Sequence, residues 1–155
     1  MHEHFRLHIE SLHPSFEALV QSAPFTFGSM PTELPKAGIY LFTEGDRHLY
    51  VGRTNNLRKR LQGHCSPGSS HNTAAFAFRL AREACNVTKA TYKPEGSRVQ
   101  LMKETAFAAA FVAAKGRLRA MHVRVVEENS PIRQALLEMY VAVVLEAPYN
   151  DFDNH

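Results

Sequence analysis

The sequence is poor in the residues that build crosslinked or membrane-embedded proteins. Its 155 residues include no tryptophan and only two cysteines. Two cysteines without a CxxC pair make neither a disulfide framework nor a zinc ligand set, so we expect Cys65 and Cys85 to be reduced thiols. The longest uninterrupted apolar runs, 106–114 and 139–145, are well short of the ~20 residues that cross a bilayer. We therefore expect no membrane-spanning segment.

A secretion signal is also missing from the N-terminus. The first twelve residues carry three histidines, two glutamates and an arginine, whereas a signal peptide needs an apolar stretch and a small-residue cleavage site. We therefore expect a cytoplasmic protein. The composition, 45% apolar and 21% charged, is typical of one ordinary soluble domain, and a chain of this length buries enough apolar surface to fold without a crosslink.

Acidic residues are scarce in the middle of the chain. Residues 47–124 carry 15 lysines and arginines but only Glu83, Glu95 and Glu104, a formal charge of +12, whereas the flanks carry 3 basic and 12 acidic residues, a charge of −9. A polycationic segment attracts phosphates at long range and gains binding free energy from counterion release. The expected partner is nucleic acid. Charge alone is equally compatible with a helical insert that has a solvated basic face.

Hydrophobic periodicity and capping residues predict a mixed fold of helices and a few strands. Thr54 or Asn55 is the expected N-cap of the second helix, and Gly116 is expected to end the fourth. The expected elements are helices over 2–22 with a break or restart near Pro14, 54–64, 73–85 and 98–115, a strand over 121–126, and a last helix that begins after Ser130 and ends before Pro148.

A β-hairpin is predicted in the first third of the chain. Two β-prone runs, 39–43 and 47–51, are separated by Glu-Gly-Asp at 44–46, which indicates a three-residue turn. In that register Tyr40 lies directly opposite Tyr50. Residues that oppose each other share a face of the sheet, so the two phenols are expected to point the same way.

This hairpin carries two short motifs that make the sequence resemble the GIY-YIG nuclease family. Residues 38–40 read Gly-Ile-Tyr, and 50–52 read Tyr-Val-Gly. The similarity continues into the next helix, where the family has an arginine and, one turn later, a histidine or tyrosine; here these are Arg60 and His64. It covers 38–64 and about 121–150 of the chain.

Two further residues near the C-terminus resemble the family's site. Glu138 is similar to its metal-binding glutamate, and Asn150, in the sequence Pro-Tyr-Asn, to its closing asparagine. The resemblance implies an α+β fold in which a small three-stranded antiparallel sheet is flanked by helices. It also implies a metal-dependent endonuclease that hydrolyses phosphodiester bonds of nucleic acid, most of all DNA, with selection by structure.

The resemblance also assigns roles to individual residues. It implies that Glu138 holds a Mg²⁺ or Mn²⁺ ion, that Tyr40 orients or deprotonates the attacking water, and that Tyr50 hydrogen-bonds the phosphate or the water. The implied catalytic residues are Tyr40, Tyr50, Arg60, His64 and Glu138, and the implied substrate-binding residues are Arg53, Thr54, Asn56 and Asn150.

The chemistry of these side chains is compatible with those roles but leaves alternatives. Arg60 offers a planar, permanently charged fork that suits a phosphate. A phenol titrates near 10, so Tyr40 can act as a base only where nearby positive charge favours its phenolate. His64 is able to relay a proton near neutral pH or, instead, to satisfy carbonyls at the end of its helix. Asn150 is either a brace of the site or an ordinary turn residue.

Glu138 is the only charged residue in the stretch 135–145. Its helix is apolar nearly all round, so we expect the helix and the carboxylate to be largely buried. A buried carboxylate needs a partner. Without the family resemblance that partner would be Arg133 or Arg124; with it, a divalent ion that keeps several waters is favoured.

The sequence departs from compact relatives at both ends of the hairpin motif. We expect a single nuclease-like domain over 1–155, with a helical extension over 1–37 that covers the sheet and a basic helical insert over 65–120 that contains two helices. Phe76, Phe78 and Tyr92 of the insert either extend a nucleic-acid surface or belong to a plain core. No separate specificity domain is expected. The alternative function is a non-catalytic nucleic-acid-binding accessory protein on the same scaffold.

Overall fold

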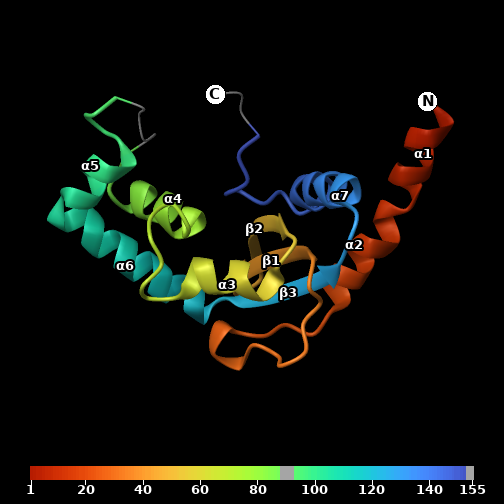
Figure 1. Ribbon diagram of the computed structural model, residues 1–155, viewed down its shortest axis with the longest axis horizontal. Coiled ribbons are helices and arrows are strands. Elements are labelled where there is room, and N and C mark those ends of the chain that lie inside the picture. The colour runs from red at the N-terminus through yellow and green to blue at the C-terminus, as the bar shows by residue number, and fades with distance from the viewer. Residues whose placement is uncertain (88–92, 153–155) are drawn as a thin grey trace. The chain divides into compact units, whose positions relative to one another are not determined.

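The computed structural model of this protein describes residues 1–87 and 93–152 (Figure 1). It divides into two compact units. The sheet unit comprises Met1–Arg60 and the chain from Met121 onward, and the helical unit comprises Leu61–Ala120. Within the described residues, no helix is both long enough and apolar enough to cross a membrane.

The sheet unit is built on three antiparallel strands in the order β2-β1-β3. β1 is Gly38–Glu44, β2 is Arg47–Thr54 and β3 is His122–Glu127. The predicted α+β architecture, with a three-stranded antiparallel sheet flanked by helices, is confirmed. Each strand of the hairpin is longer than its β-prone run, because pairing with a neighbour extends a strand beyond its strongest local propensity.

The register of the hairpin differs from the prediction. Its turn consists of two residues, Gly45 and Asp46, and Gly45 adopts a left-handed conformation with φ of +61°, which such turns favour. The ladder then slips between Phe42 and Thr43, where β2 contributes one extra residue. A prediction that assumes one uniform register misses such a bulge. The extra residue allows both the tight turn and the packing of the core side chains.

Because of the slip, Tyr40 pairs with Gly52 and Tyr50 pairs with Phe42. The two tyrosines are diagonal neighbours instead of direct partners, but they still share a face of the sheet. Gly52 explains how Tyr40 is accommodated: a Cβ atom at this position would lie 2.2 Å from the phenol oxygen and from Cζ of Tyr40. The absent side chain of Gly52 therefore makes room for the Tyr40 ring.

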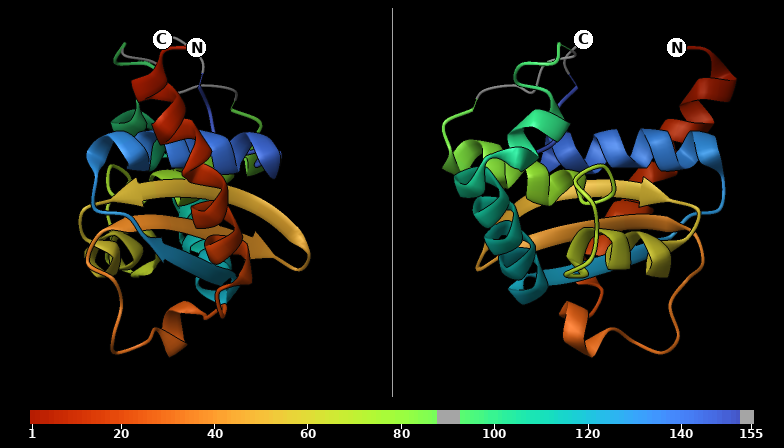
Figure 2. Two further views of the ribbon diagram at one scale, coloured as in Figure 1. Left: turned by 90° about the vertical axis from the view of Figure 1, so that its right-hand side faces the viewer. Right: turned by 60° about the vertical axis from the view of Figure 1, so that its left-hand side comes forward.

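The opposite face of the sheet is covered by helices α2 (Leu12–Gln21) and α7 (Pro131–Val144) (Figure 2). Both helices pack on a core of buried side chains. The core residues are Leu12, Leu19, Ile39, Leu41, Val51, Leu137 and Val141. Helix α1 (Glu3–Glu10) precedes α2, and a short 3₁₀ turn, η1 (Phe27–Ser29), follows it.

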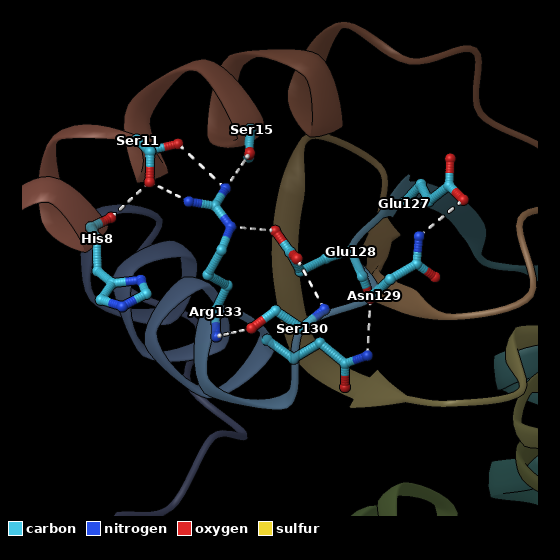
Figure 3. Close-up of polar contacts among 9 residues, drawn as sticks. His8, Ser11, Ser15, Glu127, Glu128, Asn129, Ser130 and Arg133 are labelled. Carbon is cyan, nitrogen blue, oxygen red and sulfur yellow. Dashed lines mark hydrogen bonds and ion pairs between the residues drawn. The ribbon is translucent and has the colours of Figure 1, made fainter.

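The break in the N-terminal helix lies at Ser11, three residues before the predicted site. Pro14 sits inside the first turn of α2, where its missing N–H is not needed for a helical hydrogen bond. Arg133 of α7 holds this junction: its guanidinium contacts the hydroxyls of Ser11 and Ser15 and forms an ion pair with Glu128, Nε to Oε2 2.7 Å (Figure 3).

Helix α7 begins as predicted, with Ser130 as its N-cap and Pro131 as its first residue. The Ser130 hydroxyl accepts a hydrogen bond from the backbone N–H of Arg133. The expectation that α7 is largely buried is wrong, since Ile132, Met139 and Val143 on its outer side are 52 to 65% exposed. Apolar sequence on a helix does not ensure burial when only one side meets the sheet.

The helical unit contains α4 (Ala75–Ala84), α5 (Arg98–Lys103) and α6 (Thr105–Ala120). The predicted helix over 98–115 is thus two helices, which separate at Glu104, and three helices stand where two were expected. Ser97 caps α5, and its hydroxyl accepts a hydrogen bond from the backbone N–H of Gln100. Gly116 does not end α6, because one glycine inside a helix costs only about 1 kcal/mol, which the packed neighbours of α6 outweigh.

Aromatic side chains form the core of the helical unit. Phe76 and Phe78 of α4 are 1% exposed, and the Phe78 ring lies 5.1 Å from that of Phe107 in α6, centroid to centroid. Of the two alternatives for these phenylalanines, the core is therefore correct. Tyr92 lies outside the described residues. Cys65 and Cys85 are free thiols, as expected.

Gly52→Ala tests the packing of Tyr40 across β2. The added methyl collides with the phenol, so we expect the free energy of unfolding to fall by about 1 to 3 kcal/mol, as for other overpacked cores. The measurement is urea denaturation followed by circular dichroism. Gly28→Ala is the control, since a Cβ there meets nothing within 4 Å; equal effects of the two substitutions would contradict the proposed collision.

Candidate active site

The two strand tyrosines and Arg60 form a contiguous group in the sheet unit. Arg60 Nε donates a hydrogen bond to the hydroxyl of Tyr40 at 3.2 Å. The ring centroids of Tyr40 and Tyr50 are 6.3 Å apart, and the Tyr50 hydroxyl is hydrogen-bonded with both Tyr40 and Arg60. β1, β2 and the first turn of α3 (Leu57–Cys65) each supply one of the three side chains.

Burial keeps both phenols in their neutral form. It raises the pKa of Tyr40 far above its ordinary value, and the neighbouring Tyr50 adds to the increase, while the charge of Arg60 lowers the pKa only in part. The pKa of Tyr50 is also raised, again mainly by burial. The positive charge of Arg60 therefore does not offset the effect of burial on the pKa of Tyr40.

Glu138 lies at the edge of this group. Its Oε2 accepts a hydrogen bond from Arg53 Nε at 2.9 Å, which is also an ion pair. The Glu138 side chain is 23% exposed, so it is largely buried, as expected, and its salt-bridge partner is Arg53 in place of the expected Arg133 or Arg124. Arg133 pairs with Glu128, and Arg124 donates to the carbonyl of Ser22.

Electrostatics connects Glu138 with the tyrosines. Burial raises the pKa of the Glu138 carboxyl, and the hydrogen bond and charge of Arg53 lower it. In turn, the negative charge of Glu138 raises the pKa of both Tyr40 and Tyr50. Five side chains of the sheet unit, three of them charged, thus share one electrostatic environment: Tyr40, Tyr50, Arg53, Arg60 and Glu138.

The site offers one carboxylate to a metal ion. Among the described residues, no three histidine, cysteine, aspartate or glutamate side chains come together as a metal-binding group. Mg²⁺ is commonly held by one or two carboxylates, with waters and substrate phosphate as its other ligands. Partly exposed Glu138 fits that mode of binding, although Arg53 already contacts one of its two oxygens.

Asn150 braces the free edge of β2. Its amide nitrogen donates to the carbonyl of Val51, and its amide oxygen accepts from the N–H of the same residue, both at 2.8 Å. The preceding Tyr149 donates its backbone N–H to the carbonyl of Leu49. The C-terminal segment therefore satisfies backbone groups on both sides of Tyr50 and supports the strand that carries it.

Thr54 and Asn56 shape the start of α3. The Asn56 side chain accepts a hydrogen bond from the backbone N–H of Lys59 at 3.0 Å and is therefore the N-cap, in place of the predicted Thr54 or Asn55. The Thr54 hydroxyl accepts from the N–H of Asn56 at 3.0 Å. These contacts set the direction of α3, from which Arg60 reaches Tyr40; a direct role in substrate binding stays a prediction.

His64 lies in the last turn of α3 and belongs to the helical unit. Its side chain is fully buried. The sheet unit thus brings together four of the five predicted catalytic side chains, and His64 belongs to the other unit. Its predicted part in proton transfer stays a prediction.

Several cations of the basic middle segment serve the fold. Arg58 donates to the carbonyls of Pro31 and Thr32. In the helical unit, buried Lys115 donates to the carbonyls of Pro67 and Ser69. The formal charge of this segment therefore overstates the number of cations that a nucleic acid can meet.

Two features of the site were not predicted from the sequence. One is the packing of Tyr40 over Gly52, and the other is the ion pair of Arg53 with Glu138. The sequence signal for the packing of Tyr40 over Gly52 is a small residue next to a large aromatic residue on the same face of the sheet. This signal can be read only when the strand register is known. The second joins residues 85 positions apart, and no local pattern marks it.

Tyr40→Phe tests the burial of the Tyr40 hydroxyl through the pH dependence of stability. Above the ordinary pKa of about 10, the unfolded chain releases this proton while the folded chain retains it, so stability falls as the pH rises. We expect the variant to lose less unfolding free energy than the wild type between neutral pH and pH values above 10. Urea denaturation measures this, with Tyr140→Phe as control; identical losses in all three proteins would contradict it.

Comparison with known proteins gives one family match. The family model described as the GIY-YIG catalytic domain matches residues 36–106, which include Tyr40, Tyr50, Arg53 and Arg60. Glu138 and Asn150 lie beyond the matched segment and reach it through the contacts described above. Neither the curated proteins nor the solved structures contain a match. The motif-bearing hairpin and the helix after it thus lie in a segment of this chain that matches the GIY-YIG catalytic domain.

Proposed function

We propose that this protein is a divalent-metal-dependent endonuclease that hydrolyses phosphodiester bonds in DNA and selects its substrate by structure. The observation that carries the proposal is the joint environment of Tyr40, Tyr50, Arg60 and Glu138 in the sheet unit. A protein that only binds nucleic acid has no need of a carboxylate beside its phosphate-binding arginine, because the carboxylate repels phosphate.

Arg60 is the proposed ligand of the scissile phosphate. Its guanidinium is half-buried beside two phenols, where lower polarity strengthens its attraction for an anion. Because Arg60 also donates to Tyr40, the phosphate and the tyrosine hydroxyls are brought to the same place. This arrangement stabilises the negative charge that develops on the phosphate during attack.

The tyrosines are the proposed positioning groups for the attacking water and the phosphate. As a neutral phenol, Tyr40 orients the water by hydrogen bonding, and Tyr50 holds a phosphate oxygen. The water oxygen then bonds to phosphorus, the bond between phosphorus and the leaving oxygen breaks, and the proton that the water loses ends on the leaving oxygen. Positioning of this kind lowers the barrier by removing the entropy cost of assembling the reactants.

Glu138 is the proposed holder of a Mg²⁺ or Mn²⁺ ion. Such an ion, when bound, supplies positive charge to the leaving oxygen and lowers the pKa of coordinated water. The half-buried carboxylate beside the tyrosine pair supports this role.

Glu138→Gln is the first test of the proposal. We expect cleavage to fall by roughly 10²- to 10³-fold, the loss seen when one charge-stabilising group is removed from an active site. The assay uses labelled duplex, single-stranded, flap and supercoiled DNA with Mg²⁺, Mn²⁺ or EDTA, so that it also reports the preferred structure.

Glu146→Gln is the matched control for this assay. Glu146 follows the same helix and is exposed, so its substitution removes the same charge outside the site and should leave cleavage unchanged. Binding without cutting on every substrate, insensitive to Glu138, would support a non-catalytic accessory protein instead.

Arg60→Lys separates charge from geometry at the phosphate ligand. The lysine keeps the positive charge but loses the planar fork and the Nε bond to Tyr40. We expect kcat to fall by about 10- to 100-fold with a smaller change in DNA affinity. Single-turnover cleavage and fluorescence anisotropy measure the two quantities; loss of affinity alone would show that Arg60 binds substrate without contributing to the reaction.

A further inference from the structure

The ion pair between Arg53 and Glu138 joins two groups that the proposed reaction needs separately. Arg53 stands near the end of β2 and is a proposed contact of the substrate phosphate, and Glu138 is the candidate metal ligand. In the structure each is the other's partner, with Nε and Oε2 2.9 Å apart. A carboxylate held by a guanidinium is a poor metal ligand, because the arginine neutralises its charge and repels a cation.

We propose that the Arg53–Glu138 pair is a latch that couples binding of nucleic acid to binding of the divalent ion. The inference rests on the proposed function and concerns its regulation. A phosphate group that approaches the site draws the Arg53 guanidinium to itself, since arginine binds phosphate through two parallel hydrogen bonds. Glu138 is then free to hold the metal ion, and each ligand favours the other.

The need of each charge for an opposite partner explains why binding of phosphate and binding of the metal ion are linked. If phosphate takes Arg53 alone, the half-buried Glu138 carboxylate loses its cation and stands beside an anion. If metal takes Glu138 alone, Arg53 is left next to a doubly charged cation. When both ligands bind, one ion pair is replaced by two, arginine with phosphate and carboxylate with metal, and no charge is left without a partner.

The fold allows the latch to open without moving the backbone. The ends of the pair are anchored separately: Arg53 lies in the β1–β2 ladder opposite Ile39, and α7 packs on the core through Leu137 and Val141. The Arg53 side chain is 47% exposed and that of Glu138 is 23% exposed. The arginine is therefore the solvent-exposed member of the pair, and rotation of its side chain is enough to separate the two groups.

Metal binding in the absence of nucleic acid is the first test. Calorimetric titration with Mn²⁺ alone compares the full-length wild type with Arg53→Gln, Glu138→Gln and Lys59→Gln. We expect Arg53→Gln to bind Mn²⁺ about fivefold more tightly or better, the lower end of typical coupling between sites, and Glu138→Gln to lose the site. Lys59 is exposed on α3, so Lys59→Gln controls for the loss of one positive charge and should stay within about twofold of the wild type.

Linkage to nucleic acid is the second test. Anisotropy of a labelled duplex is measured in EDTA and in Ca²⁺ at matched ionic strength, in a Tyr40→Phe background so that the duplex stays intact. Ca²⁺ should tighten binding at least about threefold more in the Tyr40→Phe protein than in Tyr40→Phe/Arg53→Gln, because only the former has a latch to open. General screening by Ca²⁺ is the same in both proteins.

The outcomes separate this inference from the proposed function. Equal Mn²⁺ affinity of Arg53→Gln and Lys59→Gln, or an equal effect of Ca²⁺ on both duplex measurements, would overturn the latch while cleavage by the wild type still supports the nuclease. A wild type that neither cuts DNA nor binds Mn²⁺ through Glu138 would overturn the proposed function. If Arg53→Gln does not fold by circular dichroism, Arg53→Lys replaces it, with a smaller gain in Mn²⁺ affinity expected because the lysine keeps the charge but loses the fork.

Discussion

The close packing of Tyr40 against Gly52 is the constraint on which the site depends. A buried phenol ring lies across β2 only because the residue paired with it has no side chain. The ring in turn determines where its hydroxyl meets Arg60 and how near it comes to Tyr50. Both triplets of the family motif thus have a physical meaning: each contributes one phenol, and the second contributes the space for the first.

A second glycine has a comparable role at the start of the hairpin. A Cβ on Gly38 would lie 2.0 Å from the carbonyl oxygen of Val126 in β3. Each of the two motif glycines therefore allows a close contact. The missing side chain of Gly38 leaves room for the backbone of β3, and that of Gly52 leaves room for the Tyr40 ring. The sheet can be narrow and still bury a tyrosine because both approaches are close.

Long-range contacts complete the site around this hairpin. Helix α7 brings Glu138 to Arg53, and the segment after α7 brings Asn150 to Val51, so that both the end and the free edge of β2 are engaged by the C-terminal part of the chain. Such an edge would otherwise present unpaired backbone groups. The same contacts that protect β2 thus place the carboxylate near the tyrosines.

Local sequence determined most of the elements of this protein and the motif of its hairpin, and tertiary structure decided how the elements meet. The strand motifs and the Ser130 cap were readable because they depend on near neighbours in the chain, whereas the three-stranded sheet, in which β1 pairs with the distant β3, followed from the family resemblance. The strand partner of Tyr40 was not readable, because a bulge at Phe42 and Thr43 shifts the register of the hairpin. The partner of Glu138 was not readable either: a charged side chain pairs with whichever cation the fold brings within reach, and here that is Arg53 from a distant strand.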